Sequence, residues 1–557
     1  MFDKNYLEKV RQEKEKWEKL YENLKERDVK FVTDSEIPIK NLYTPLDLKD
    51  KDYMNDINFP GMAPYTRGVY PSMYRGRLWT MRLFSGHGTP EETNKRWKFL
   101  YENGETGFSA AVDALTFNGI DPTNPDGAPE VGTSGVPLYC IDSLFALTED
   151  IPIDKISVAL VVEPFTSAPV CAMYFNMAKI RGYDISKLMG TTQNDILTMT
   201  VGYIPYKNCP PNHILRLACD FIEWTVPMKN VPRWHPINFT GYNYREGGID
   251  AVQELGFVFA SACSHIDNLI ERGWKVDDFV GRLAFHLAAH KDFFEEIAKF
   301  RAARRIWYKL MKKYDAKDPK NFGFRFHVQT AGSSLTAQLP KVNIVRTAIQ
   351  ALEANLGGCQ SLHTNSYDEA ICLPSEEAAL VALRTQQVIS DESRIHNTID
   401  PLAGSYFVEW LTDEIEEKVW KYMDKIQKVG SIDKALSTGF LYKEMRDAFH
   451  KRRMRIENNE EIMLGVNKYP VPYDDVTDVF RTNKEAIAIE VERINKLKAR
   501  RDNAKLEKIL DKLRNVCEKE ENVMPIVMDA TKEGATVGEI CDIYREVWGI
   551  WEPPLAI

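Results

Sequence analysis

The chain has 557 residues, 44% of them hydrophobic and 27% charged, and a net charge of -9. This composition is ordinary for a globular protein with a large core, and the acidic balance argues against a nucleic-acid surface. The charged N-terminus has no signal-peptide core, and the longest apolar run, Ile156–Val162, is too short to span a membrane. The nine scattered cysteines form no C-x-x-C pair, which favours reduced thiols. We therefore expect a cytoplasmic protein that binds neither nucleic acid nor membrane.

The N-terminal part of the chain is predicted to be a helix followed by an extended arm. Residues Leu7 to Asp28 are rich in Glu and Lys and carry a narrow apolar stripe, which is typical of a mostly solvated helix. Prolines then recur at Pro38, Pro45 and Pro60, where they forbid a long helix. We predict that residues 1–63 form this helix and arm.

Four arginines follow among aromatic residues between Pro64 and Gly86. In an otherwise acidic protein this pattern indicates an anion-binding site, because the planar guanidinium group of arginine can donate two hydrogen bonds to a phosphate. Composition leaves a second interpretation open, a solvated arm whose arginines form scattered ion pairs.

From Trp79 to about residue 405, short apolar or mixed segments alternate with amphipathic helical segments. The predicted strands are Leu78–Phe84, Gly107–Asp113, Ile156–Val162, Ile237–Gly241, Arg325–Thr330 and Gln360–Thr364. The clearest helices are Thr93–Glu102, Asp250–Arg272 and Phe293–Tyr314. This alternation predicts a parallel α/β fold, best matched by a (β/α)8 TIM barrel over residues 64–410. Beyond Leu411 the pattern is helical and charged, so residues 411–557 are predicted to be a helical C-terminal region.

Two of the predicted strands carry polar side chains on one face at period two. These polar residues are Arg325, His327, Gln329, Ser361, His363 and Asn365. The lumen of an α/β barrel is normally filled by branched apolar side chains. Because unpaired buried polar groups are costly, this pattern predicts a polar tunnel that a long polar ligand could occupy.

A series of longer motifs occurs in a fixed order along the chain. They are Thr80–Arg82, Gly190–Leu197, Gly241–Tyr242, Lys299–Arg304, Gln329–Gln338, Gln360–Ala370, Ile399–Ser405 and Gly465–Tyr469. Together they resemble the large, catalytic chain of the adenosylcobalamin-dependent acyl-CoA mutases, the methylmalonyl-CoA and isobutyryl-CoA mutase family. The resemblance runs from about Pro64 to the C-terminus, and ordered matches are far more specific than a single motif.

The resemblance implies a barrel threaded by the pantetheine arm of coenzyme A, and a radical 1,2-rearrangement of the acyl group by an isomerase. The residues that would hold the nucleotide end and upper arm of coenzyme A are Tyr70, Met73, Arg77, Thr80 and Arg82. Those that would line the rest of the acyl-CoA path are Ser109, Thr191, Gln193, Arg282, His327, Gln360 and Ser361. Those that would contact the deoxyadenosyl group are Tyr242, Glu246, Asn365 and Glu369. The catalytic residues implied are Gln193, Tyr242, Asn243 and Gln329.

The chain lacks the cobalamin-binding module that the resemblance would require. The family signature Asp-x-His-x-x-Gly does not occur, so we expect adenosylcobalamin to be brought by a separate small subunit that contacts the C-terminal region. The chain alone should be inactive, a dimer of heterodimers is expected, and a G-protein chaperone is the further partner that the resemblance suggests. His286 and His290, interpreted as lying on a helix with Asp292, are treated as surface or packing residues, and no metal ligands are predicted.

The predicted acyl pocket differs from those of well-known family members. Methylmalonyl-CoA mutases carry a tyrosine where Phe84 stands and an arginine for the free carboxylate, which residues 198–208 lack. Relatives that act on 2-hydroxyisobutyryl-CoA carry an aspartate where Ala111 stands. We therefore predict a neutral branched substrate similar to isobutyryl-CoA. Methylmalonyl-CoA, 2-hydroxyisobutyryl-CoA and a bulkier acyl-CoA are the alternatives.

One further departure concerns the thioester. The histidine of the family's Gly-Tyr-His, which bonds the thioester carbonyl, is replaced here by Asn243. An amide can donate a hydrogen bond but cannot give a proton. Asn243 therefore keeps open an alternative of another class, a non-catalytic acyl-CoA-binding subunit. The matched residues of the deoxyadenosyl site favour the enzyme.

Overall fold

The computed structural model describes residues 2–124, 130–200, 208–472, 481 and 483–554. All strand pairs between its ten strands are parallel. The strands are β1 (Thr80–Met81), β2 (Phe84–Ser85), β3 (Phe108–Ala111), β4 (Val158–Val161), β5 (Gly190–Thr192), β6 (Trp234–His235), β7 (Ile237–Thr240), β8 (Leu283–Ala289), β9 (Phe326–Thr330) and β10 (Ser361–His363). The predicted parallel α/β fold is confirmed.

The strands form two five-stranded sheets, in the orders β1-β10-β9-β8-β7 and β2-β3-β4-β5-β6. Only Arg82 and Leu83 separate β1 from β2, and only Pro236 separates β6 from β7. The sheets therefore share two nearly continuous segments, and the series of pairings returns to its starting segment. This cyclic order is the one that the predicted barrel requires.

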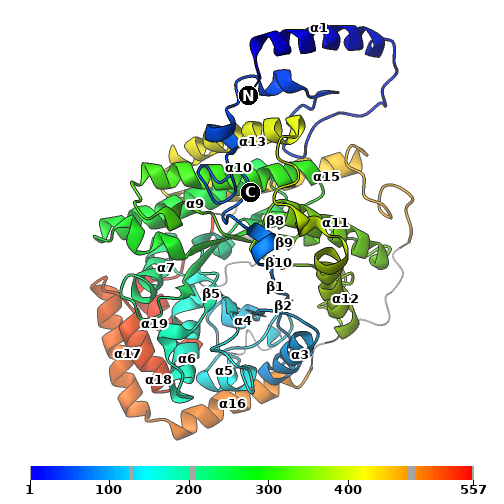
Figure 1. Ribbon diagram of the computed structural model, residues 1–557. Coiled ribbons are helices and arrows are strands. Elements are labelled where there is room, and N and C mark those ends of the chain that lie inside the picture. The colour runs from blue at the N-terminus through cyan, green and yellow to red at the C-terminus, as the bar shows by residue number, and fades with distance from the viewer. Residues whose placement is uncertain (1, 125–129, 201–207, 473–480, 482, 555–557) are drawn as a thin grey trace.

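Helices make the crossovers that parallel neighbours need, and they surround the sheets in Figure 1. In chain order the crossover helices are α3 (Pro90–Glu102), α5 (Ile141–Leu147), α6 (Pro164–Ile180), α7 (Pro211–Thr225), α8 (Gly241–Glu246), α9 (Ala251–Glu271), α10 (Phe293–Lys313) and α11 (Asn343–Leu356), and α12 (Glu376–Gln387) follows β10. Local sequence fixes where they begin: Thr89 and Asp250 form capping boxes at the starts of α3 and α9. Helix α6 is buried almost throughout because apolar residues occupy all of its faces.

The two ends of the chain are arranged differently. Helix α1 (Lys4–Tyr21) buries no residue and stands away from the sheets in Figure 1. The C-terminal helices α16 (Ala486–Arg500), α17 (Asn503–Glu518), α18 (Met524–Lys532) and α19 (Val537–Trp548) lie beside α5 and α6. Asn176 of α6 donates to the carbonyl oxygen of Met528 at 2.8 Å, which fixes α18 on α6. The predicted division of the chain at residues 63 and 410 stays a prediction.

Strands β5, β6 and β8 were not predicted from the sequence, and the predicted placement of His286 on a helix is wrong. β5 and β6 are too short to show a period, and the apolar run that forms β8 reads equally well as a helix. His286 was placed on a helix with His290 and Asp292, but it lies in β8, His290 follows that strand, and Asp292 caps α10. In the described part of the chain, no helix has the length and hydropathy needed to cross a bilayer.

Candidate active site

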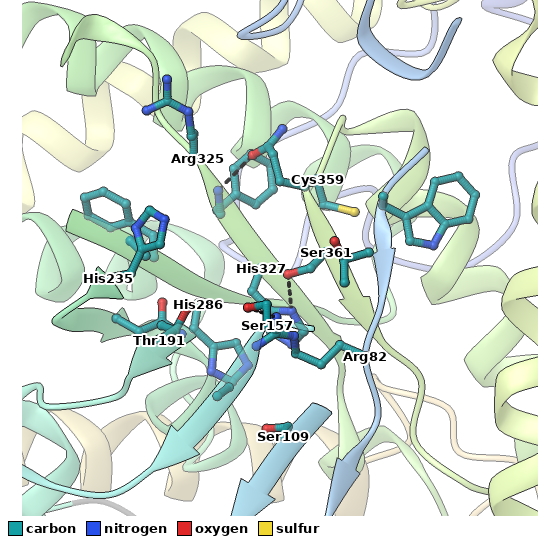
Figure 2. A pocket seen from close by; sticks show the side chains of 18 of the residues that line it. Arg82, Ser109, Ser157, Thr191, His235, His286, Arg325, His327, Cys359 and Ser361 are labelled. Carbon is teal, nitrogen blue, oxygen red and sulfur yellow. Dashed lines mark hydrogen bonds between the residues drawn. The ribbon is translucent and has the colours of Figure 1, made fainter. Parts of the chain in front are cut away.

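A cavity of about 760 Å³ lies inside the ring of strands, and each of the ten strands contributes a residue to its wall. Figure 2 shows its polar lining. The predicted site residues that line it are Tyr70, Met73, Arg77, Thr80, Arg82, Phe84, Ser109, Thr191, Gln193, His327, Gln360 and Ser361. The polar face predicted for β9 and β10 thus does face an internal cavity.

Arginine side chains gather at the end of the cavity where β9 begins. Arg325 donates from Nε to the hydroxyl of Tyr70 at 3.0 Å, and its guanidinium lies 5.8 Å from the centre of that ring. Burial, together with the charges of Arg325 and Arg233, lowers the pKa of Arg282. Like charges held close together favour the binding of an anion at this end. Arg282 itself does not line the cavity, although its carbonyl oxygen lies 3.0 Å from His235 Nδ1.

Both interpretations of the four arginines between residues 64 and 86 are partly correct. Arg77 and Arg82 line the cavity, as the predicted anion-binding site requires. Arg82 donates to Ser157 Oγ at 2.7 Å, and burial lowers its pKa to about 10. Arg67 instead donates to Asp400 at 3.3 Å, which is the ion-pair alternative.

Neutral histidines surround Phe84 in the interior of the cavity. The Phe84 ring centre lies 5.7 Å from that of His286, 5.8 Å from that of His327 and 5.0 Å from that of His363. The Phe84 amide donates to His363 Nδ1 at 2.9 Å, and His327 Nδ1 lies 2.7 Å from Ser361 Oγ. Burial lowers the pKa of His286 and of His363 to about 3, and lowers that of His327 well below its usual value. These imidazoles are therefore uncharged at neutral pH.

A second group of predicted residues converges beyond the carboxyl end of β9, around Gly332. A Cβ atom at Gly332 would lie 3.0 Å from Glu246 Oε2 and 3.1 Å from Asn365 Nδ2, so the glycine leaves room where these side chains meet. Gln329 donates to Asn365 Oδ1 at 3.1 Å. The Tyr242 ring stacks on His286 with centres 5.1 Å apart, and this contact joins the Gly332 group to the cavity.

The electrostatics of the Gly332 group differ from those of the cavity. Burial raises the pKa of Glu246 to about 7 and, with the nearby charge of Glu246, also raises the pKa of Glu369 to about 7. Asn365 Nδ2 is buried without a hydrogen-bond partner. A space lined by two titratable carboxyl groups and an unsatisfied amide suits a ligand rich in hydroxyl and ring-nitrogen groups. The matched deoxyadenosyl-contact residues therefore fit such a group.

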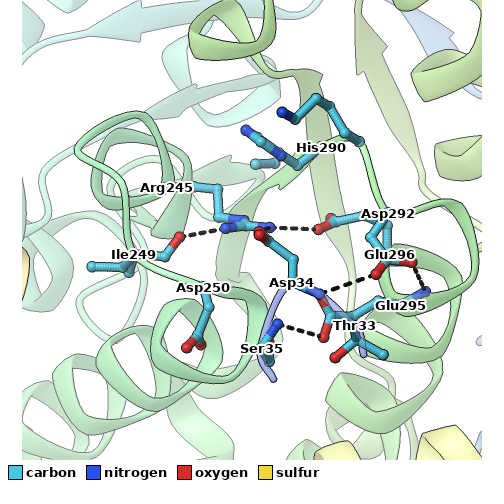
Figure 3. A network of polar contacts seen from close by, with 12 residues as sticks. Thr33, Asp34, Ser35, Arg245, Ile249, Asp250, His290, Asp292, Glu295 and Glu296 are labelled. Carbon is cyan, nitrogen blue, oxygen red and sulfur yellow. Dashed lines mark hydrogen bonds and ion pairs between the residues drawn. The ribbon is translucent and has the colours of Figure 1, made fainter. Parts of the chain in front are cut away.

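A network of ion pairs holds the helix that carries Tyr242 and Glu246 (Figure 3). Arg245 of α8 donates to Asp34 of the N-terminal arm at 2.7 Å and to Glu296 of α10 at 3.2 Å. Arg452, from α15 (Phe440–Glu457), donates to Ser333 Oγ at 3.2 Å, and the amide of Ser333 donates to Glu246 at 2.6 Å. The arm and a C-terminal helix thus brace the Gly332 group.

Three predicted site residues lie in neither group: Arg282, Ala111 and Asn243. Ala111, at the end of β3, and Asn243, in the first turn of α8, do not line the cavity. Most of segment 198–208, where an arginine was sought, lies outside the described residues. Among the cavity residues that sequence reasoning missed are Ser157, His235 and His286. Arg325, which alternation placed on the polar face of its strand but which was given no site role, also lines the cavity.

Comparison with known proteins identifies the family to which the chain belongs. The family model described as methylmalonyl-CoA mutase matches residues 32–550. The 2-hydroxyisobutanoyl-CoA mutase large subunit of Aquincola tertiaricarbonis is 40% identical over 529 residues, covering 94% of this chain and 93% of the relative. The methylmalonyl-CoA mutase of Escherichia coli is 36% identical over 507 residues, covering 91% of this chain and 70% of the relative. The methylmalonyl-CoA mutase large subunit of Porphyromonas gingivalis is 35% identical over 519 residues, covering 93% and 72%.

The fold is a parallel α/β ring around a polar cavity, and the matching relatives give its class as acyl-CoA isomerases. The chain belongs to the methylmalonyl-CoA mutase family. Members of this family are vitamin B12-dependent isomerases that act on coenzyme A thioesters. In the described part of the chain, no three His, Cys, Asp or Glu side chains are placed to hold a metal ion.

Proposed function

We propose that this chain is the catalytic subunit of an adenosylcobalamin-dependent mutase that rearranges a neutral, branched acyl-CoA similar to isobutyryl-CoA. The observation that carries the proposal is the stack of Phe84, His286 and Tyr242, which connects the internal cavity to the Gly332 group. An acyl group at Phe84 would then lie next to the cluster that suits a deoxyadenosyl group.

The cavity residues bind and orient the substrate. Alternate residues mark the path: Arg325, directly before β9, lines the cavity, and Gln329 of β9 lies roughly 13 Å further along the chain. Tyr70, Arg77 and Arg325 would grip the nucleotide end by charge and ring contacts, and His327 and Ser361 would line the pantetheine path. Closed strands around this path exclude water, which protects a reactive intermediate from side reactions.

When bound, adenosylcobalamin supplies the radical that starts the rearrangement. Glu246 and Asn365 would hold the deoxyadenosyl group near the substrate. The Tyr242 hydroxyl stays protonated, because burial and the Glu246 and Glu369 carboxyl groups raise its pKa well above the usual value. The uncharged Tyr242 side chain would therefore lie between the acyl-CoA and the deoxyadenosyl group.

The neutrality of the pocket favours an uncharged acyl group. Phe84 and the histidines around it offer no cation to a free carboxylate, and a buried charge without a partner costs several kcal/mol. Ala111, which the resemblance matches to the aspartate of 2-hydroxyisobutyryl-CoA mutases, has no side-chain hydrogen-bonding group and does not line the cavity. The relative from Aquincola tertiaricarbonis is the reason to keep 2-hydroxyisobutyryl-CoA as the second candidate.

A separate small subunit is proposed to bring cobalamin. Two of the relatives are named as large subunits. Beyond Gly332, the chain exposes apolar side chains at its surface: Leu339 is 41% exposed, Leu464 43% and Tyr469 75%. Arg346 donates to the carbonyl oxygen of Leu464 at 3.0 Å, which keeps the segment of Leu464 beside α11. We propose that this surface receives the small subunit in a dimer of heterodimers, with a G-protein chaperone as a further partner.

Reconstitution tests the proposal. The chain is assayed alone and with its small subunit and adenosylcobalamin, and conversion of isobutyryl-CoA to its linear isomer is followed by mass spectrometry. We expect turnover only in the complete mixture. Binding of acyl-CoA without turnover of any branched acyl-CoA would instead support the non-catalytic subunit that Asn243 leaves open.

A further inference from the structure

His286 lines the cavity, but none of the contacts proposed so far joins its side chain to the substrate. It lies in β8, opposite Thr240 of β7 and His327 of β9. Its side chain lines the cavity and is only 2% exposed, and Figure 2 shows its ring pointing into the interior. Its Nε2 atom is buried without a hydrogen-bond partner. A buried polar atom in this condition destabilises the protein unless a ligand supplies its hydrogen bond.

The neighbours of His286 place it where the two halves of the site meet. On one side its ring packs on Phe84 at 5.7 Å, and on the other it stacks on Tyr242 at 5.1 Å with the planes 2° apart. His327 meets it edge-on at 4.8 Å. An acyl group in contact with Phe84 and directed toward Gly332 must pass this imidazole.

The protonation state of His286 suits a neutral hydrogen bond. Burial and, to a lesser extent, the neighbouring His363 ring lower its pKa to about 3, against a smaller opposing effect of the Gln329 side chain. The imidazole is therefore neutral, with one N–H and one lone pair. A carbonyl oxygen at Nε2 would select the tautomer that carries Nε2–H.

We propose that His286 is a substrate-contacting residue whose Nε2–H donates to the thioester carbonyl oxygen of the acyl-CoA. This inference rests on the proposed function and assigns the carbonyl contact to strand β8 instead of to helix α8, which carries Asn243. The thioester carbonyl is the polar group that every acyl-CoA presents at its reacting end. Asn243 does not line the cavity, whereas His286 does so with an unsatisfied atom.

A packing role for His286 makes a different prediction. If the imidazole served only to fill the stack between Phe84 and Tyr242, a phenylalanine would replace it and any loss would not depend on the ligand's carbonyl group. The discriminating experiment therefore changes the ligand and the residue together.

The dissociation constants of isobutyryl-CoA and of its S-isobutyl thioether, in which a methylene replaces the carbonyl, are measured by calorimetry on the full-length chain. His286→Phe should weaken isobutyryl-CoA about tenfold, the effect of one hydrogen bond, and leave the thioether within about twofold. His286→Gln, which retains a donor, should recover part of the loss. The matched control is His235→Phe, on the wall of the same cavity, which should weaken both ligands by the same factor.

Infrared difference spectra give a second readout that does not depend on affinity. The stretching frequency of a 13C-labelled thioester carbonyl should be lower in the wild-type complex than in either His286 variant. Equal losses for thioester and thioether, or an unchanged carbonyl frequency, would overturn the inference. Wild-type protein that bound neither ligand would overturn the proposed function, whereas equal wild-type affinities for the two ligands would overturn the role of His286 alone.

Discussion

Asp34 and Arg245 are separated by 211 positions in the chain, yet Arg245 Nη2 lies 2.7 Å from Asp34 Oδ2. The Arg245 side chain is 1% exposed and that of Asp34 is 15% exposed. Burial alone would raise the pKa of Asp34, but the charges of Arg245, His290 and Arg455 hold it well below its usual range. The pair therefore stays ionised, and it connects the N-terminal arm to the helix that carries Tyr242 and Glu246.

Removing Asp34 is expected to destabilise the protein and to reduce turnover. Asp34→Ala leaves the buried Arg245 with one carboxylate fewer, and breaking such a pair costs about 3–5 kcal/mol. Chemical unfolding measures the loss of stability. Because α8 would lose a contact that fixes its orientation, kcat should fall while the dissociation constant of acyl-CoA changes little.

A surface pair provides the control for this prediction. Glu417 and Lys421 lie one turn apart on α13 (Tyr406–Gln427), with side chains 64% and 71% exposed. Glu417→Ala is expected to leave the stability almost unchanged, because solvent screens an exposed ion pair. Equal effects of Asp34→Ala and Glu417→Ala would contradict the bracing role of the arm.

Glu163 is expected to make the stability of the protein fall as pH rises. It is fully buried, its Oε1 accepts from Asn208 Nδ2 at 3.1 Å, its Oε2 has no partner, and burial raises its pKa to about 8. Below about pH 4.5 this carboxyl is protonated in both the folded and the unfolded chain. Between about pH 4.5 and 8 only the unfolded chain loses the proton, so its stabilising contribution is lost over that window.

Glu163→Gln removes this titration while keeping an acceptor for Asn208. At pH 5 the variant should be about as stable as the wild type, and at pH 8 it should be more stable by about 2–4 kcal/mol. Urea unfolding at pH 5, 6.5 and 8 measures the difference. A difference between variant and wild type that did not change with pH would show that Glu163 is ionised in the folded protein.

Phe84 is expected to determine which acyl groups fit. Phe84→Tyr adds a hydroxyl among His286, His327 and His363 and fills space that an alkyl group would use. We expect kcat/KM for isobutyryl-CoA to fall about tenfold or more, the effect of placing a polar group against an apolar ligand. Methylmalonyl-CoA should remain a non-substrate, since no cation has been added. Efficient turnover of methylmalonyl-CoA by this variant would contradict the role given to pocket charge.

Glu246 is expected to act on the cofactor rather than on the acyl-CoA. With a pKa near 7, it is protonated at pH 6 and ionised at pH 8, so kcat should rise through this interval if the carboxylate holds the deoxyadenosyl group. Glu246→Gln should abolish that rise and lower kcat about tenfold to a hundredfold. The affinity for acyl-CoA should not change, because Glu246 does not line the cavity. A variant with weaker acyl-CoA binding and unchanged kcat would contradict this assignment.

The alternation of polar and apolar residues within single strands was enough to predict that the cavity has a polar lining. His327 and Ser361 were expected on one face, and their side chains do meet in the cavity, with His327 Nδ1 2.7 Å from Ser361 Oγ. The family resemblance added residues of other walls, such as Ser109 and Thr191, which alternation alone did not identify. Local pattern and family resemblance thus gave most of the cavity residues.

What the sequence could not predict depends on contacts between distant segments. Nothing near Asp34 in the sequence indicates that it pairs with Arg245. The spacing of His286 and His290 suggested one face of a helix, whereas parallel pairing with β7 and β9 makes the segment a strand and directs His286 into the cavity. The role of His286 therefore became visible only in three dimensions.

The most direct test of the central claim is the relative kcat/KM of a panel of acyl-CoAs, measured on the chain reconstituted with its small subunit and adenosylcobalamin. The panel contains isobutyryl-CoA, methylmalonyl-CoA, 2-hydroxyisobutyryl-CoA and bulkier branched acyl-CoAs. The neutral pocket around Phe84 predicts that an uncharged branched acyl-CoA without a hydroxyl group is isomerised fastest. Preference for methylmalonyl-CoA or 2-hydroxyisobutyryl-CoA would contradict it.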